Sequence, residues 1–318
     1  MVKVSGNYLI ARTLKEEGVD TLFYLMGGPN FDTIMECQDV GIRTVDFRHE
    51  QAAAMAAHAY SRVTGKPSVV MAASGPGTLN LLTGVYTASI DCAPMVILGG
   101  ASAVHEIGRD TFQEVDQVGI MQPLCKYWHR PTMASRFPEV VSTAYRQAQS
   151  GRPGPVYIDC GGDVLYEEVE EESVPTPSRA LERTRPVATS GDIERAMALI
   201  ANAERPLLFA GGGAFFSGAA PELEKFVDVT SIPFYTAPMS RGLVPEDHAV
   251  SFQGARSTAM RESDVVLVVG TRMNWMMNYG QRFAPNAKII QIDINEAELG
   301  HNRDVEMGIF GDAKAVMA

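Results

Sequence analysis

The sequence is short of basic residues and of cysteine. Its 318 residues include 27 Lys and Arg against 38 Asp and Glu, a formal net charge of −11. A surface that binds nucleic acid or an anionic membrane needs a basic field, so we expect neither partner. The cysteines lie far apart without a CxxC pair, which favours reduced, packed thiols over a zinc or redox site. They are Cys37, Cys92, Cys125 and Cys160.

Long apolar runs and several catalytic motifs are also missing. No stretch reaches the roughly 18–20 apolar residues that cross a bilayer, and the amino terminus lacks the basic-then-apolar pattern of a signal peptide. We therefore expect a cytoplasmic protein. The absence of G-x-x-x-x-G-K-[ST], H-E-x-x-H and G-x-S-x-G removes the strongest sequence support for P-loop phosphoryl transfer, zinc proteolysis and serine hydrolysis. The scattered histidines show no ligand spacing, and we predict no metal site within the chain.

What is present is an alternation of apolar strands and helices. Strands that are apolar throughout predict parallel sheets covered on both faces, and hence an α/β fold with two doubly wound domains. We place the first domain at residues 1–166, an interdomain linker in the acidic, then Pro-rich stretch 167–189, and a Rossmann-like second domain at 190–318. In the first domain a single helix is expected over 78–90. Gly-rich turns at 27–28, 75–77 and 99–100 should follow strands, at the sheet edge where such folds bind ligands.

Glu50 stands at the junction of an expected strand, 44–47, and an alanine-rich helix, 51–62. A carboxylate in a first helical turn commonly acts as a simple cap, worth roughly 0.3–1 kcal/mol. The unusually small residues of this helix leave a second interpretation open, because they let another backbone or a flat ligand approach closely. The neighbouring His49 has the chemistry of a general base, although a lone histidine at a helix start is more often structural.

The second domain carries a triple glycine, Gly211 to Gly213, after a strand. Phe216 stands where the third glycine of G-x-G-x-x-G would be, so that motif is absent. Backbone N–H groups at such a turn can still hold a phosphate. Arg272 and Asp293 each follow an expected strand, where ligand contact and structural salt bridging are both open. Trp275 is expected to be a core aromatic residue.

Five motifs follow one another along the chain: Arg48-His49-Glu50-Gln51-Ala52, Thr64-Gly65-Lys66-Pro67, Ser74-Gly75-Pro76-Gly77, Phe112-Gln113-Glu114-Val115-Asp116 and Gly151-Arg152-Pro153-Gly154-Pro155-Val156. In order and spacing they closely resemble thiamine diphosphate-dependent enzymes of the acetolactate synthase, 2-hydroxyacyl-CoA lyase and oxalyl-CoA decarboxylase group. The resemblance covers essentially the whole chain.

The resemblance implies an aminopyrimidine-binding first domain and a central second domain. It makes Glu50 the carboxylate that bonds the pyrimidine nitrogen of the cofactor and so activates the thiazolium carbon. Such an exchange is sensible chemistry, because a positioned carboxylate can share a proton with a ring nitrogen of matched basicity. Gln113 is implied as a second catalytic residue. The implied cofactor-binding positions beside Glu50 are Gly27, Gly28, Ser74, Gly75 and Gly77.

The second domain resembles 2-hydroxyacyl-CoA lyases and oxalyl-CoA decarboxylases more than acetolactate synthases, above all at Gly270 to Trp275. The resemblance therefore implies an acyl-CoA substrate, with a 2-oxoacid as the alternative. It also implies an adenine nucleotide such as ADP, or CoA itself, at Arg152, Gly212, Arg272 and Asp293.

A third, diphosphate-binding (PP) domain of the family has no counterpart here, because Gly311-Asp312-Ala313 is not its Gly-Asp-Gly motif. We expect a separate subunit to hold the diphosphate and Mg²⁺, in a hetero-oligomer of the α2β2 type, and the chain to be inactive alone. A truncated chain is the other explanation. An acetolactate synthase-like or 2-oxoacid decarboxylase subunit and a non-catalytic nucleotide-binding scaffold remain alternative functions.

Overall fold

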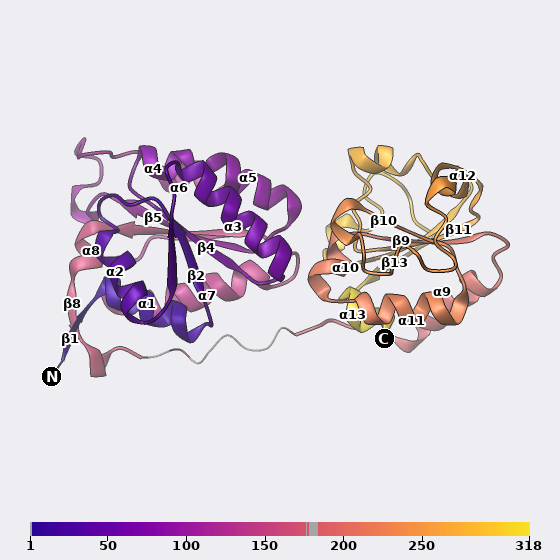
Figure 1. The fold of residues 1–318 in the computed structure, drawn as a ribbon, viewed down its shortest axis with the longest axis horizontal. Helices are drawn as coiled ribbons and strands as arrows, with labels where there is room; N and C mark the ends of the chain where they lie inside the picture. Colours follow the sequence, from indigo (N-terminus) through magenta and orange to yellow (C-terminus); the bar gives the residue numbers. More distant parts are fainter. Residues whose placement is uncertain (1, 176, 178–183) are drawn as a thin grey trace. The chain divides into compact units, whose positions relative to one another are not determined.

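The computed structural model describes residues 2–175, 177 and 184–318, and the chain divides into two compact units, Met1–Arg183 and Thr184–Ala318 (Figure 1). Each unit has a parallel sheet with helices on both faces, so the predicted fold class is confirmed. Residues 176 and 178–183 of the expected linker lie outside the described residues.

The first unit is built on a six-stranded parallel sheet in the order β3-β2-β4-β5-β7-β6. Its strands are β2 (Thr21–Tyr24), β3 (Arg43–Asp46), β4 (Ser68–Ala72), β5 (Met95–Ala101), β6 (Tyr127–His129) and β7 (Pro155–Gly161). Its helices are α1 (Gly6–Glu16), α2 (Phe31–Asp39), α3 (Glu50–Thr64), α4 (Pro76–Asn80), α5 (Leu82–Asp91), α6 (Gln117–Met121), α7 (Phe137–Gln149) and α8 (Gly162–Tyr166). Figure 1 shows α1 and α7 on one side of this sheet and α3 and α5 on the other.

Both faces of this sheet are buried, which explains why its strands are apolar throughout. In β4, Val69 and Met71 pack in the cluster beneath α1 and α7. Val70, between them, is also fully buried, and because successive side chains of a strand alternate, it faces α3 and α5. Parallel strands covered on both sides have no polar face.

The alanine-rich helix α3 uses its small residues for helix packing. A Cβ added to Gly84 of α5 would collide with Ala54 of α3, so the two helices approach closely at this point. The helix ends at Gly65, whose φ of 70° suits a residue without a side chain. The small residues of α3 therefore allow the close approach of another helix backbone. A close-packed backbone is one of the two partners, with a flat ligand, that the sequence leaves open for this helix.

Two local predictions for the first unit were wrong. The helix expected over 78–90 is divided into α4 and α5, because the Leu81 amide bonds to Thr78 O and tightens the chain there. Gly99 and Gly100 belong to β5 rather than to a turn, since β7 pairs with β5 as far as Ala101. The segment around Gln117, which shows no periodicity, forms α6.

The acidic stretch expected to begin the linker is partly ordered structure of the first unit. Residues Glu168–Glu170 form β8, which pairs antiparallel with β1 (Lys3–Ser5). Arg12 of α1 lies 3.1 Å from Glu171 and Tyr8 donates a hydrogen bond to the same carboxylate. Arg12 and Tyr8, near the amino terminus, thus hold Glu171 in place, although composition alone assigns this residue to the linker.

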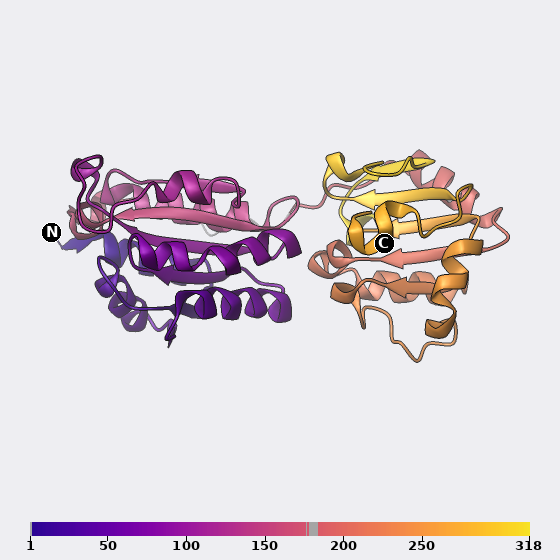
Figure 2. The ribbon, with the colours of Figure 1, turned by 90° about the horizontal axis from the view of Figure 1, so that it is seen from above.

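The second unit has a five-stranded parallel sheet in the order β10-β9-β11-β12-β13. Its strands are β9 (Pro206–Ala210), β10 (Phe234–Thr236), β11 (Val265–Val269), β12 (Lys288–Asp293) and β13 (Met307–Phe310). Its helices are α9 (Ser190–Ala201), α10 (Gly212–Ser217), α11 (Ala220–Thr230), α12 (Arg256–Glu262) and α13 (Ala313–Met317), and Figure 2 shows the unit from a second direction. Alternate residues of β11 again serve two cores, with Leu267 in one cluster and Val266 in the other.

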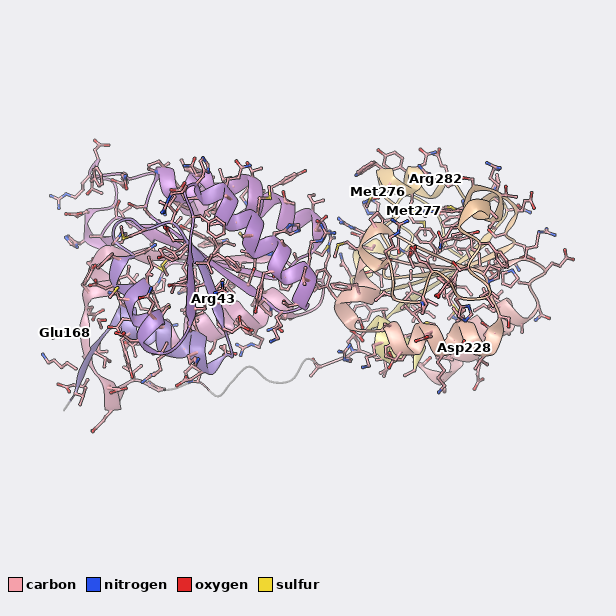
Figure 3. All side chains as sticks on the ribbon, viewed as in Figure 1. Arg43, Glu168, Asp228, Met276, Met277 and Arg282 are labelled. Carbon is pink, nitrogen blue, oxygen red and sulfur yellow. The ribbon has the colours of Figure 1, made fainter. Side chains whose placement is uncertain are left out.

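The expectation that Trp275 is a core residue was wrong, because its side chain is 70% exposed. Met273 and Met277 fill the core beside it instead. Figure 3 labels Met277 together with its neighbour Met276, which is 41% exposed. Among the described residues, no helix has both the length and the apolar character to cross a membrane.

Candidate active site

The sheet of the first unit reverses its strand order between β2 and β4, and such reversals are where doubly wound folds bind ligands. The loops at this point contain two pairs of predicted cofactor residues, Gly27 with Gly28 and Ser74 with Gly75. The Ser74 amide donates to Gly28 O at 3.2 Å. A Cβ on Gly27 would lie 2.6 Å from Cβ of Ala73. Glycine at position 27 thus lets the two loops pack against each other.

Glu50 is the first residue of α3 and is buried, with 8% of its surface exposed. The helix is capped by His49, whose Nδ1 accepts a hydrogen bond from Gln51 N at 3.1 Å. Glu50 is therefore not the capping group. Its Oε2 accepts from Asn80 Nδ2 at 3.0 Å, whereas Oε1 forms no hydrogen bond within the described parts of the chain. One oxygen is held in place and the other is available to a ligand.

The loop after β4 lies directly against this carboxylate. A Cβ on Gly77 would be 3.4 Å from Glu50 Oε1, so a side chain at position 77 would crowd the oxygen. Ser74 Oγ donates to Gln113 Oε1 at 3.0 Å. Gly75 has a φ of 57°, and a Cβ there would also collide with the Gln113 carbonyl. The structure thus brings the predicted residues together, while their roles in catalysis stay predictions.

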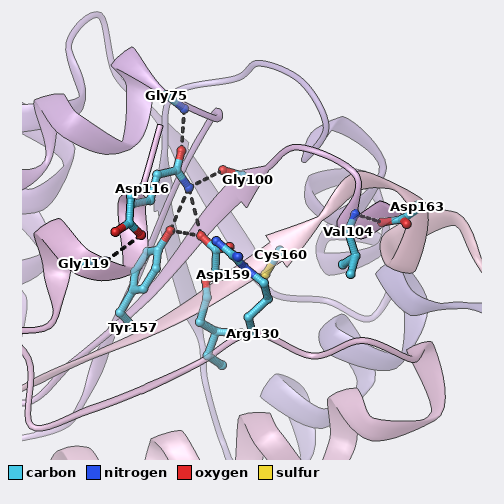
Figure 4. Close-up of polar contacts among 12 residues, drawn as sticks. Gly75, Gly100, Val104, Asp116, Gly119, Arg130, Tyr157, Asp159, Cys160 and Asp163 are labelled. Atoms are coloured by element: carbon cyan, nitrogen blue, oxygen red, sulfur yellow. Dashed lines mark hydrogen bonds and ion pairs between the residues drawn. The ribbon is translucent and has the colours of Figure 1, made fainter. Parts of the chain in front are cut away.

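A buried polar network beneath this loop has no counterpart in the predicted site. The amide of Gly75 donates to Gln117 Oε1, as Figure 4 shows. Gln117 Nε2 lies 2.9 Å from each of three oxygens, Gly100 O, Tyr157 OH and Asp159 Oδ1. Gln117 is 2% exposed. Its only sequence signal is an amide in an otherwise apolar stretch that follows Asp116, which caps α6.

Asp159 is the centre of this network and is completely buried. Arg130 Nε donates to its Oδ2 at 2.5 Å, and Tyr157 OH donates to its Oδ1 at 2.5 Å. Burial, and then the charge of Asp159, raise the pKa of Tyr157 well above its ordinary value. The phenol therefore keeps its proton and remains a hydrogen-bond donor to the carboxylate.

Three of the four predicted nucleotide residues lie at one edge of the second unit. Gly212 and Arg272 follow the adjacent strands β9 and β11, whereas Asp293, expected just past a strand, is the last residue of β12. All three lie at the carboxyl ends of their strands. The strand order reverses between β9 and β11, so this edge is also a topological switch point. Gly213 N donates to Gly270 O at 2.9 Å, which joins the two loops.

The fourth predicted nucleotide residue, Arg152, belongs to the first unit. It lies in the turn before β7, at the amino end of that strand and so at the edge opposite the Ser74 loop. Its Nε donates to Cys92 Sγ at 3.0 Å. The structure therefore separates Arg152, by unit, from Gly212, Arg272 and Asp293.

A small cavity adjoins the site of the first unit. Its volume is about 170 Å³, and Gln113, Gln117, Arg130 and Ser102 are among the residues that line it. Within the parts of the chain that the structure describes, no three His, Cys, Asp or Glu side chains are grouped as metal ligands.

Comparison with known protein families identifies the family to which the chain, with these two sites, belongs. Residues 4–120 match the model for the thiamine pyrophosphate enzyme N-terminal TPP-binding domain, and residues 193–318 match the model for the thiamine pyrophosphate enzyme central domain. The chain belongs to the thiamine pyrophosphate enzyme family. Thiamine pyrophosphate is the cofactor named thiamine diphosphate above, so the predicted family is confirmed.

Relatives within the thiamine pyrophosphate enzymes differ in reaction. The chain is 37% identical to a 2-hydroxyacyl-CoA lyase of Arabidopsis thaliana, over 99% of this chain and 56% of the relative. It is 39% identical to a probable acetolactate synthase large subunit of Methanococcus aeolicus, over 99% and 54%. It is 33% identical to an oxalyl-CoA decarboxylase of Escherichia coli, over 98% and 56%. The chain spans about half the length of the curated relatives it matches.

The first-unit site has the chemistry to hold a flat polar ring, such as the pyrimidine half of thiamine pyrophosphate. Glu50 offers one carboxylate oxygen at the switch point, and Gly75 and Gly77 leave space where other residues would place a side chain. Asn30 is 2% exposed, and its Oδ1 has no hydrogen-bond partner among the described residues. A planar ring carrying an amino group and ring nitrogens has the donors and acceptors for such a site.

Proposed function

We propose that the chain forms the aminopyrimidine-binding and central part of a thiamine diphosphate-dependent carbon–carbon lyase resembling 2-hydroxyacyl-CoA lyase. The enzyme would cleave a 2-hydroxyacyl-CoA to formyl-CoA and an aldehyde or ketone, or form it from them. The observation that carries the proposal is the Glu50 carboxylate, which is buried at the switch point with Oε2 bonded to Asn80 and Oε1 unbonded among the described residues.

In this proposal Glu50 exchanges a proton with the pyrimidine nitrogen through Oε1. Asn80 fixes the carboxylate by donating a hydrogen bond to Oε2, so Oε1 is the oxygen that takes up and releases the exchanged proton. Gly27 and Gly28, with the Ser74–Gly77 loop, surround the ring, and Gln113 faces the reacting centre from its contact with Ser74. When bound, thiamine diphosphate supplies the electron sink for breaking or forming a bond next to a carbonyl.

The diphosphate and its Mg²⁺ would be held by a separate subunit, in an α2β2 hetero-oligomer, and the chain would be inactive alone. The relatives extend to about twice the matched region, and in this proposal the separate subunit corresponds to the unmatched half. Co-purification of the tagged chain followed by mass measurement tests this assembly. All four thiols are unpaired, as they would be in a reducing compartment, and we place the enzyme in the cytoplasm.

Replacement of Glu50 by Gln in the complete enzyme tests the proposed function. Glutamine still accepts the hydrogen bond from Asn80 but cannot exchange the proton, so we expect kcat to fall by roughly 10²- to 10⁴-fold. Glu172→Gln, at an exposed carboxylate of the same unit, is the matched control and should leave kcat unchanged. An E50Q enzyme with more than half of the normal kcat contradicts the proposal.

The acetolactate synthase-like reaction is the second candidate, because the identity to the Methanococcus aeolicus protein is as high as that to the lyase. A panel of 2-hydroxyacyl-CoA thioesters and 2-oxoacids, assayed with the complete enzyme, separates the two. Turnover of 2-oxoacids alone, including their decarboxylation, would favour the second candidate. Nucleotide binding with no turnover of either class would instead favour a non-catalytic scaffold.

We also propose that the switch point of the second unit binds an adenine nucleotide such as ADP, or CoA. Arg272 would bind phosphate, Gly212 would let the phosphate approach the backbone, and Asp293 would accept from a ribose hydroxyl. Titration calorimetry with ADP and with CoA should show a loss of affinity for Arg272→Ala and none for Arg282→Ala, an exposed control.

A further inference from the structure

The polar network beneath the Ser74–Gly77 loop ends on a buried ion pair. Asp159 is bonded to Arg130 at 2.5 Å, and Tyr157 donates to the same carboxylate. A Cβ on Gly99 would lie 2.6 Å from the Tyr157 ring, so glycine at position 99 leaves room for the phenol to lie against β5 beside Asp159, its neighbour on β7. A fully buried carboxylate is costly unless its partners are fixed, and these contacts fix them.

Gln117 joins this ion pair to the loop, and its amide can adopt only one orientation. Nε2 faces three oxygens, of which Gly100 O and Asp159 Oδ1 are acceptors only. Oε1 faces the backbone N–H of Gly75. Turning the amide over would set oxygen against two acceptors and nitrogen against a donor. Asp159 thus dictates that Gln117 presents an acceptor to the loop.

Gly75, in turn, begins the segment that defines the position of Glu50. It is the residue before α4, and a Cβ at its position would collide with the Gln113 carbonyl. Two residues later Gly77 lies against Glu50 Oε1, and the last residue of α4, Asn80, holds Oε2. A shift of the loop at Gly75 is therefore passed to both oxygens of the carboxylate.

We propose that Gln117 is a positioning residue, which holds the Ser74–Gly77 loop and α4 against Glu50 through its hydrogen bond to Gly75. The inference rests on the proposed function for its effect on catalysis, but the hydrogen bond itself does not. Gln117 acts on the loop, and through the loop on the carboxylate that exchanges the proton.

Replacement by methionine, Gln117→Met, keeps the volume of the side chain and removes both polar ends. In the free chain, we expect the Gly75 amide to exchange its hydrogen about 10- to 100-fold faster, because a buried amide loses its partner. In the complete enzyme, we expect kcat to fall about tenfold or more while KM for the substrate changes less than about threefold, since Gln117 acts on Glu50 and not on the substrate. Gln122→Met, at an exposed position just after α6, should change neither quantity.

A second variant, Gln117→Leu, also removes the acceptor for Gly75. It should speed the exchange of the Gly75 amide and lower kcat as Gln117→Met does, and it serves if the methionine variant does not fold. Unchanged exchange at Gly75 in both variants would overturn the inference, because the hydrogen bond would then not hold the loop. Faster exchange with kcat within twofold of normal would also overturn it, since the bond would be merely structural.

These experiments distinguish a failure of the proposed function from a failure of the role proposed for Gln117. An E50Q enzyme of normal activity refutes that function and the catalytic part of this inference with it, whereas the exchange rate of Gly75 still decides whether Gln117 holds the loop. A loss of kcat in E50Q but not in Q117M refutes the role of Gln117 alone.

Discussion

A methyl group added to Gly99 is a severe test of the packing around the buried network. Gly99 lies in β5 with an ordinary φ, so Gly99→Ala introduces no backbone strain. The new Cβ would lie 2.6 Å from Cε2 and 2.8 Å from Cζ of Tyr157, and it would collide with the phenol oxygen. Carbon contacts are optimal at about 3.5–4.0 Å, so the ring must move by roughly 1 Å.

That movement has two costs. Overpacking of a core costs about 1–3 kcal/mol, and Tyr157 is completely buried. The displaced hydroxyl would also weaken its bonds to Asp159 and Gln117, where a buried polar group without a partner costs about 1–3 kcal/mol. We expect the free energy of unfolding to fall by about 3 kcal/mol, which is a decrease of roughly 6–12 °C in Tm for a unit of this size.

Urea unfolding and calorimetry of the whole chain measure the change. Gly254→Ala is the control, because a Cβ there has no atom within 4 Å, and it should alter the free energy of unfolding by less than about 0.5 kcal/mol. Combining Gly99→Ala with Tyr157→Leu should cost at least about 1 kcal/mol less than the sum of the single changes, because the leucine vacates the contested space. A loss below about 1 kcal/mol for Gly99→Ala, or strict additivity in the double variant, would refute the reasoning.

Two further predictions concern titratable groups. Burial alone raises the pKa of Asp312, but hydrogen bonds from Ser217, Arg185 and the Ala315 amide outweigh it, so the pKa lies below its ordinary value. The ionised carboxylate therefore stabilises the fold at pH values above its pKa in the unfolded state, about 4, and this contribution is lost as the pH falls through its pKa in the folded state. Asp312→Asn should flatten the acid side of a plot of the free energy of unfolding against pH. Burial raises the pKa of Cys37 to about 12, so iodoacetamide at neutral pH should label the half-exposed Cys92 well before Cys37, as peptide mass spectrometry can check.

The local pattern of the sequence predicts much of this fold because local chemistry determines it. The sequence predicts a Ser5 cap and a helix over 137–149. Ser5 Oγ accepts from Tyr8 N at 3.2 Å at the start of α1, and α7 is Phe137–Gln149. The sequence also predicts strands over 206–210, 234–236 and 265–269, which are β9, β10 and β11, since short apolar runs between turn residues have few alternatives. The family motifs likewise point to Glu50 and the glycine loops without any structure.

Non-local contacts decided the rest. The sequence left Glu50 between a helix cap and a ligand-binding carboxylate. The structure gives the cap to His49 and joins one oxygen of Glu50 to Asn80, 30 residues further along the chain, while ligand binding by Glu50 stays a prediction. Part of the acidic run forms β8 because its backbone pairs with β1 near the amino terminus, while Lys3 and Arg12 lie near the carboxylates of Glu168 and Glu171. Trp275 lies outside the core because Met273 and Met277 already fill it.

Gln117 is the clearest example of a site residue that cannot be predicted from the sequence alone. No periodicity or motif marks it, because its partners Gly75, Gly100 and Asp159 are 42, 17 and 42 residues away along the chain. The sequence by itself determined most of the strands and helices and the residue types of the site, since these follow from local propensity and apolar spacing. Only the tertiary structure decided which buried polar groups meet, because hydrogen bonding between distant residues depends on how the sheet brings its strands together.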